Sequence, residues 1–182
     1  KNLLLACKYC NTRKSNKTTS ENKNDYLWPD ENNTELAYTY AGGIPRVNSP
    51  ILLELDPSGN IAQKAEKLFE LVELGNIPAP KDKDRRFKQR IETYASARIS
   101  LKKWKKLKET EYKEDSKELI AEIVRSKGFF SVWLEVFKDE PEIKNMLFDI
   151  FPGTETRFFD ADGNVRPILH VEELEAATEA AT

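Results

Sequence analysis

The sequence has little of several residue types on which whole classes of protein depend. Its 182 residues include one histidine, two cysteines and one methionine. No apolar run approaches the roughly 20 residues of a membrane-spanning helix, and no signal-peptide pattern opens the chain. Gly-rich phosphate loops, serine-nucleophile elbows and internal repeats are missing as well. We therefore expect a cytoplasmic protein without a membrane partner.

The two cysteines stand close together, as Cys7 and Cys10. This spacing makes a poor disulfide framework, and it is the spacing at which a tight turn aims two thiolates at one metal ion. A zinc knuckle and a pair of unlinked buried thiols are both compatible with the cysteines alone.

The net charge of −2 conceals two oppositely charged stretches. Between residues 81 and 108, twelve Lys or Arg stand against three Asp or Glu, whereas from residue 139 to the end three stand against eleven. The basic stretch predicts a surface for nucleic-acid phosphates, and the acidic one a solvated or partner-facing tail. The same charges are also typical of the solvated face of a long helix, so this alternative stays open. The residues expected to contact nucleic acid are Lys14, Lys17, Arg85, Arg86, Lys102, Lys103, Lys105 and Lys106.

Turn and strand signals fill the chain up to residue 60. Residues 36–40 and 44–47 flank Ala41-Gly42-Gly43 and predict a β-hairpin, whose Pro45 indicates an edge position. Residues 51–55 predict one more strand. The aromatic cluster at residues 26–28, which stops at Pro29, favours an anchored loop over a base-stacking site.

Beyond residue 60 the apolar period becomes that of helices. We predict a helix from Ile61 toward Gly75, a long helix over residues 82–109, and further helices over 116–126, 129–137 and 141–150, with a strand as the alternative at 129–137. The stripe expected to be buried on the long helix consists of Phe87, Ile91, Tyr94, Ala97, Leu101 and Trp104. On the helix that follows it, Leu119, Ile120, Ile123 and Val124 are expected to be buried.

Asp160-Ala-Asp162-Gly163-Asn164 looks like the start of a calcium loop. Its glycine is two positions too early for an EF-hand, and no bidentate Glu follows, so the segment predicts a turn.

The first seventeen residues hold the most specific pattern. The apolar residues Leu3 to Ala6 predict a short buried strand, the two cysteines follow, and Asn11 stands where a helix is expected to begin. An Asn at that position can cap the helix, or it can turn its side-chain oxygen toward a hard divalent cation.

This run resembles the second half of the HNH endonuclease motif, in which a ββα unit grips one divalent metal ion. The resemblance implies that Asn2 supports the site, that Asn11 ligates Mg²⁺ or Mn²⁺, and that Lys14 is the basic residue that often follows. It also implies that Cys7 and Cys10 form half of a structural Zn²⁺ site. The catalytic His and a second cysteine pair are then expected before Lys1. His170, the only histidine, is not expected to replace that catalytic base, because the motif takes it from a strand before Asn2.

The single methionine, Met146, adds to the expectation that the chain is the C-terminal part of a longer protein. By itself, the chain is then expected to be inactive. The fold class we predict is α+β. Residues 1–60 form the remainder of the ββα-metal module with a loop and hairpin, residues 61–153 a mainly α-helical domain, and residues 154–182 an irregular acidic tail.

The resemblance extends past the motif to one branch of bacterial HNH proteins, the nuclease component of Septu-type anti-phage defence systems. It is carried by the segments 25–30 with 33–34, 84–86, 128–139, 151–154 and 159–160. It implies phosphodiester hydrolysis of DNA in antiviral defence, together with an ABC-type ATPase partner. Two alternatives stay open: a catalytically degenerate HNH-like subunit that binds DNA or acts as a scaffold, and a zinc-ribbon interaction domain.

Overall fold

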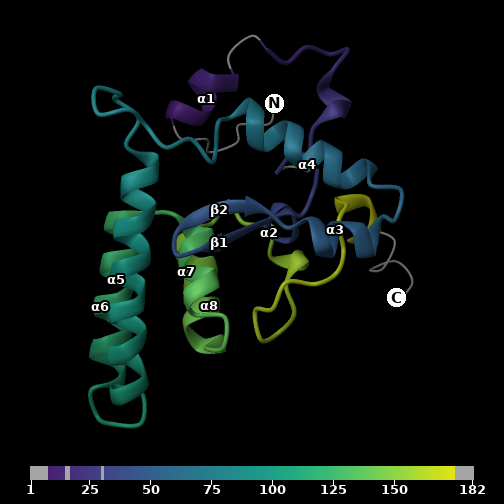
Figure 1. Ribbon diagram of the computed structural model, residues 1–182. Helices are drawn as coiled ribbons and strands as arrows, with labels where there is room; N and C mark the ends of the chain where they lie inside the picture. Colours follow the sequence, from purple (N-terminus) through teal and green to yellow (C-terminus); the bar gives the residue numbers. More distant parts are fainter. Residues whose placement is uncertain (1–7, 15–16, 30, 175–182) are drawn as a thin grey trace. The chain divides into compact units, whose positions relative to one another are not determined.

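The computed structural model describes residues 8–14, 17–29 and 31–174 of the chain, which form a mixed α and β fold that is mostly helical (Figure 1). Asn2 and Cys7 lie outside the described residues. No helix in the described part is both long and apolar enough to cross a membrane.

Short elements make up the first part of the chain. They are α1 (Lys8–Lys14), a 3-10 turn (Lys23–Asp25), α2 (Thr34–Ala37), β1 (Tyr38–Ala41), β2 (Ile44–Val47), α3 (Ser49–Leu55) and α4 (Asn60–Leu71). The predicted hairpin is confirmed. The strand predicted over residues 51–55 is wrong, because Pro50 stands in the first turn of α3 and starts a helix there.

Four α-helices follow. They are α5 (Arg86–Leu107), α6 (Lys113–Lys127), α7 (Phe130–Val136) and α8 (Pro141–Ile150), with a 3-10 turn at Thr156–Phe158. All four were predicted, and residues 129–137 adopt the helical alternative. The long helix begins four residues later than predicted, because the Asp82 carboxylate accepts a hydrogen bond from the backbone N–H of Asp84 and holds a turn there.

The chain divides into two compact units. Unit 1 contains the residues up to Thr39, Pro45–Asp84 and the segment from Val165 onward, and unit 2 contains Tyr40–Ile44 and Arg85–Asn164. The division differs from the predicted one. Helix α4 belongs with the N-terminal elements, and the predicted tail is shared between the two units.

In unit 1, α3 packs against α2 and α4. Tyr38 is buried, stacks on Phe69 at 6.2 Å between ring centroids, and donates a hydrogen bond of 2.9 Å to the carbonyl of Ala65. The polar tip of this aromatic side chain therefore has a partner inside the core.

In unit 2, α5 packs against α6 and α7, while α8 packs against α6 and α7. These contacts surround an apolar core whose buried members are Ala97, Trp104, Ile120, Val124, Trp133, Val136, Phe137, Ile143 and Leu147. Every one of these residues lies between residues 97 and 147, so this core is built from one continuous segment.

The buried face of α5 is rotated from the predicted stripe. Ala97 and Trp104 are buried as expected, but Ile91 is 38% exposed, and the other buried positions are Arg86, Arg90, Thr93 and Ser100. On α6, Leu119 was predicted to be buried and is 49% exposed. Both differences concern which face of a helix is covered, which the period alone does not decide.

Candidate nucleic-acid interface

Helix α1 carries the described part of the predicted motif. It begins at Lys8, three residues before Asn11. Asn11 was expected at the start of this helix, but it lies within it. Cys10 lies in the same helix and is partly buried. A tight turn was expected between the two cysteines. The described residues of this stretch, from Lys8 onward, are helical instead.

Lys14, at the end of α1, lies over an aromatic side chain. Its Nζ is 5.1 Å from the ring centroid of Trp28, the distance of a cation–π contact. Tyr26 packs against the same ring, with 5.6 Å between the two ring centroids, and Trp28 Nε1 donates a hydrogen bond to the carbonyl of Lys23. The aromatic cluster thus anchors its loop, as the sequence favoured, while Lys17 remains exposed.

The metal ligands expected from the sequence are Cys7, Cys10 and Asn11. Within the described ranges, no three His, Cys, Asp or Glu side chains come together as metal ligands. Of the three residues expected to ligate metal, only Cys10 has a described side chain.

The basic stretch forms most of α5, and its residues divide by exposure. Arg85, Lys102, Lys103, Lys105 and Lys106 are exposed. Arg86 is only 4% exposed, so its guanidinium is not part of the exposed basic surface, contrary to the expectation that it contacts nucleic acid.

The exposed lysines of α5 point in two directions. With about 3.6 residues per turn, Lys102 and Lys105 share one face with Arg98, while Lys103 and Lys106 share the adjacent face with Ile99. Arg98 is exposed as well, although it was not among the residues expected to contact nucleic acid. Its spacing of four and seven residues from Lys102 and Lys105 was the signal available. Within the described residues, none of Arg98, Lys102 and Lys105 forms an ion pair, although the charge of Lys105 contributes to lowering the pKa of the Glu140 carboxyl.

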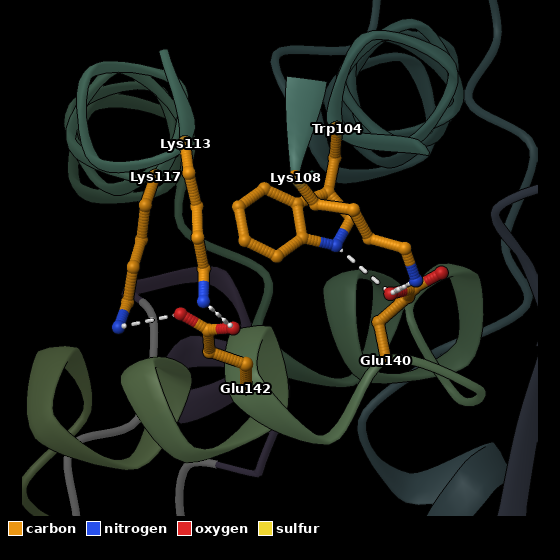
Figure 2. Close-up of polar contacts among 6 residues, drawn as sticks. All are labelled: Trp104, Lys108, Lys113, Lys117, Glu140 and Glu142. Atoms are coloured by element: carbon orange, nitrogen blue, oxygen red, sulfur yellow. Dashed lines mark hydrogen bonds and ion pairs between the residues drawn. The ribbon is translucent and has the colours of Figure 1, made fainter. Parts of the chain in front are cut away.

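The C-terminal end of α5 is fixed by a buried carboxylate. Glu140 Oε2 accepts hydrogen bonds of 2.9 Å from both Trp104 Nε1 and Lys108 Nζ, and Trp104 is itself buried (Figure 2). Beside it, Glu142 pairs with Lys113 at 2.9 Å and with Lys117 at 3.4 Å (Figure 2). Two carboxylates at the start of α8 therefore hold the turn that joins α5 to α6.

Burial and hydrogen bonding determine the pKa values of Glu140 and Lys108. Burial alone would raise the pKa of the Glu140 carboxyl, but the bonds from Lys108 and Trp104 outweigh it, and its pKa lies below the ordinary value of 4.5. The hydrogen bond to Glu140 raises the pKa of Lys108. Both groups are therefore charged near neutral pH. The positive charges of the lysines that hold the turn are balanced by the carboxylates of Glu140 and Glu142.

His170 has a structural place in unit 1. Asn32 Nδ2 lies 2.9 Å from His170 Nδ1, and the two residues form an isolated β-bridge. The side chain of Asn33 donates to the carbonyls of Arg166 and Ile168. The two asparagines thus bind the segment at 166–170 to the loop that precedes α2, a contact that sequence analysis did not predict.

The segment at 160–164 forms a closed turn. The Asp160 carboxylate accepts hydrogen bonds from the N–H groups of Asp162 and Asn164. Lys144, which is 1% exposed, donates a hydrogen bond of 2.7 Å to Asn164 Oδ1. The turn thus satisfies its own carboxylate, and the turn itself was predicted from the sequence.

No protein-family model, curated protein or solved structure matches the chain.

Proposed function

We propose that the chain is part of a metal-dependent HNH-type DNA endonuclease of bacterial anti-phage defence, and that α5 holds the nucleic-acid backbone. The proposal of nuclease activity rests on the sequence motif at the N-terminus. The proposal of backbone binding rests on one structural observation, the row of Arg98, Lys102 and Lys105 along an exposed face of α5. An ABC-type ATPase subunit is the protein partner that the resemblance implies.

The row suits phosphate groups because of its spacing and support. Successive members stand about one helical turn apart, at roughly 4.5–6 Å, so the three positive charges can lie along one short stretch of a nucleic-acid backbone. Trp104 and Glu140 hold this end of the helix, so the row is displayed on a rigid element. Contacts of this kind position a protein on the backbone and carry no sequence information.

The chemistry of cleavage needs a base for water and a cation for the charge that develops on the phosphate. In the proposed enzyme Asn11 ligates the Mg²⁺ or Mn²⁺ ion, with Asn2 as its support, while Cys7 and Cys10 contribute to a Zn²⁺ site. The general base is a histidine supplied from outside the matched residues. Asn11→Ala is expected to abolish metal-dependent nicking of plasmid DNA by protein that contains the whole motif.

The proposed interface is tested by the double variant Lys102→Gln, Lys105→Gln. Each lost phosphate contact lowers the slope of log affinity against log salt by about 0.9 on duplex DNA, so the slope should fall by about 1.8. Affinity for unrelated sequences should weaken equally.

The matched control is Lys81→Gln, Lys138→Gln, which changes the net charge equally at two exposed positions outside the sequence of α5. The control should keep the wild-type slope. If the α5 variant keeps it too, or if both variants lose it equally, α5 is not the backbone-binding element.

A further inference from the structure

An open groove of about 570 Å³ runs between α5 and α6 in unit 2. Three large side chains of the groove are well exposed: Ile99 is 60% exposed, Tyr112 55% and Leu119 49%. The groove is separate from the row of Arg98, Lys102 and Lys105, none of which lines it. Removing these side chains from water would favour association, and grouped exposed apolar residues are typical of interaction sites.

The two walls of the groove carry opposite charges near the turn that joins the helices. Lys103 of α5 and Asp115 of α6 both line the groove, and Lys106 extends the basic wall by almost one turn. At the other end the signs are exchanged: Lys127 of α6 lines the groove, and Glu92 of α5, one turn beyond the lining residue Ser96, carries a negative charge that makes an exposed ion pair with Lys88 at 3.8 Å. Within the described residues, Lys103, Lys106, Asp115 and Lys127 form no ion pair.

These charges stand at matching heights along the two helices. Measured back from the end of α5 at Leu107, Lys103 lies about 6 Å along the axis, and Asp115 lies about 3 Å from the start of α6. At the far end, Glu92 lies about 22 Å and Lys127 about 21 Å from the same turn. Ile99 at about 12 Å and Leu119 at about 9 Å fall between the two charged ends.

We propose that the groove is closed by the same groove of a second copy of this chain, around a twofold axis parallel to α5 and α6. Such an axis sets α5 of one copy against α6 of its partner at the same height. Lys103 and Lys106 then face the partner's Asp115, and Glu92 faces the partner's Lys127. The exposed apolar side chains of both copies lie between these charged ends, in an isologous contact.

The exchange of signs along the groove favours a second copy over other occupants. A partner helix with charge of one sign would find an opposite charge at one end of each wall and a like charge at the other. The surface is complementary to itself under the proposed axis. A twofold axis perpendicular to the helices would instead set α5 antiparallel to the partner's α5, with Lys103 and Lys106 near the partner's Glu92, so the charge-exchange variants below are needed to distinguish the two axes.

The mass in solution tests the proposal, using the 182-residue chain itself. Sedimentation equilibrium should give twice the monomer mass of 21.0 kDa at high protein concentration, with dissociation on dilution. Leu119→Asp places a charge in the apolar centre twice per dimer, so the dissociation constant should rise at least about a hundredfold. Ile77→Asp is the matched control, since Ile77 is 71% exposed and lies outside the groove, and it should leave the mass unchanged.

Charge exchange tests the direction of the axis. The double variant Lys103→Glu, Lys106→Glu should be monomeric at concentrations where the wild type is dimeric. Adding Asp115→Lys to the same chain should restore the dimer, because α5 and the facing α6 again carry opposite signs. Circular dichroism of each variant verifies that it is folded. A monomeric wild type, a Leu119→Asp variant that stays dimeric while folded, or a triple variant that stays monomeric would each overturn the proposal.

Discussion

Glu140 is a buried carboxylate with two donors, Trp104 Nε1 and Lys108 Nζ. A carboxylate in this environment is stabilising only while both donors remain, because an unpaired buried charge is strongly unfavourable. Glu142 makes two similar ion pairs, but its side chain is 37% exposed, against 7% for Glu140. The two neighbouring carboxylates therefore form a natural comparison of buried and exposed pairing.

Glu140→Gln should lower the free energy of unfolding by about 1.5–3 kcal/mol, the range for hydrogen bonds that involve a charged group. Glu142→Gln is the matched control and should lower it by less than about 1 kcal/mol, because solvent screens exposed pairs. Urea unfolding followed by tryptophan fluorescence would measure both. Equal effects of the two variants would mean that burial of Glu140 adds nothing to its contribution.

The same carboxylate predicts a pH dependence. Its pKa in the folded protein lies below the ordinary value of 4.5, so its contribution is present above about pH 4.5 and is lost as the pH falls through the folded value. The difference in unfolding free energy between wild type and Glu140→Gln should therefore be constant near neutral pH and shrink in acid. A difference that grows in acid would contradict the assigned direction of the shift.

At the scale of elements, the hairpin turn depends on two glycines with left-handed backbone. Gly42 has φ +64° and Gly43 has φ +81°, the conformation that a two-residue hairpin turn requires at both positions. Their surroundings differ. A Cβ on Gly42 would meet nothing within 4 Å, whereas a Cβ on Gly43 would lie 2.8 Å from the carbonyl oxygen of Arg90.

Gly42→Ala should lower the free energy of unfolding by about 1–2 kcal/mol, the strain of a left-handed backbone with a side chain. Gly43→Ala carries the same strain and adds a clash with backbone of α5, which cannot move aside, so its loss should be about 1–3 kcal/mol greater. Thermal unfolding of the two variants under identical conditions would compare them. Equal losses would show that the hairpin tip does not pack closely on α5.

At the scale of the whole molecule, the core of unit 2 is contained in one stretch of chain. Its buried members run from Ala97 to Leu147, and the four helices that supply them lie within Arg85–Asn164. Cores built from contacts close in sequence need little help from distant segments. Unit 1, in contrast, combines segments from both ends of the sequence.

A fragment of residues 85–164 should therefore be helical and unfold cooperatively on its own. Circular dichroism during heating would measure both properties. Trp133→Ala in the same fragment should abolish the cooperative transition, since this fully buried side chain is among the largest in the core. A fragment that melts without cooperativity would mean that unit 2 needs unit 1 to fold.

Local structure was largely predictable from the sequence. The three- and four-residue apolar period located α4, α5, α6 and α8, Gly42-Gly43 located the hairpin turn, and the Asp160 segment was identified as a turn. A nearly continuous apolar run located α7, with a strand as the alternative. These features depend on near neighbours in the chain, because backbone dihedrals and short-range hydrogen bonds decide them. The main local error, the strand at residues 51–55, arose because a short apolar run has no clear period.

Tertiary contacts decided the rest, including the geometry of the proposed sites. Arg86 is buried and Leu119 is exposed. The sequence had predicted that Arg86 contacts nucleic acid and that Leu119 is buried. The division of the α5 lysines between two faces, and the attachment of residues 166–170 to Asn32 and Asn33, also could not be predicted from the sequence. A helical period shows that one face is apolar, but the neighbours that bury a face come from distant parts of the chain, and only their packing determines which side chains remain exposed to bind a partner.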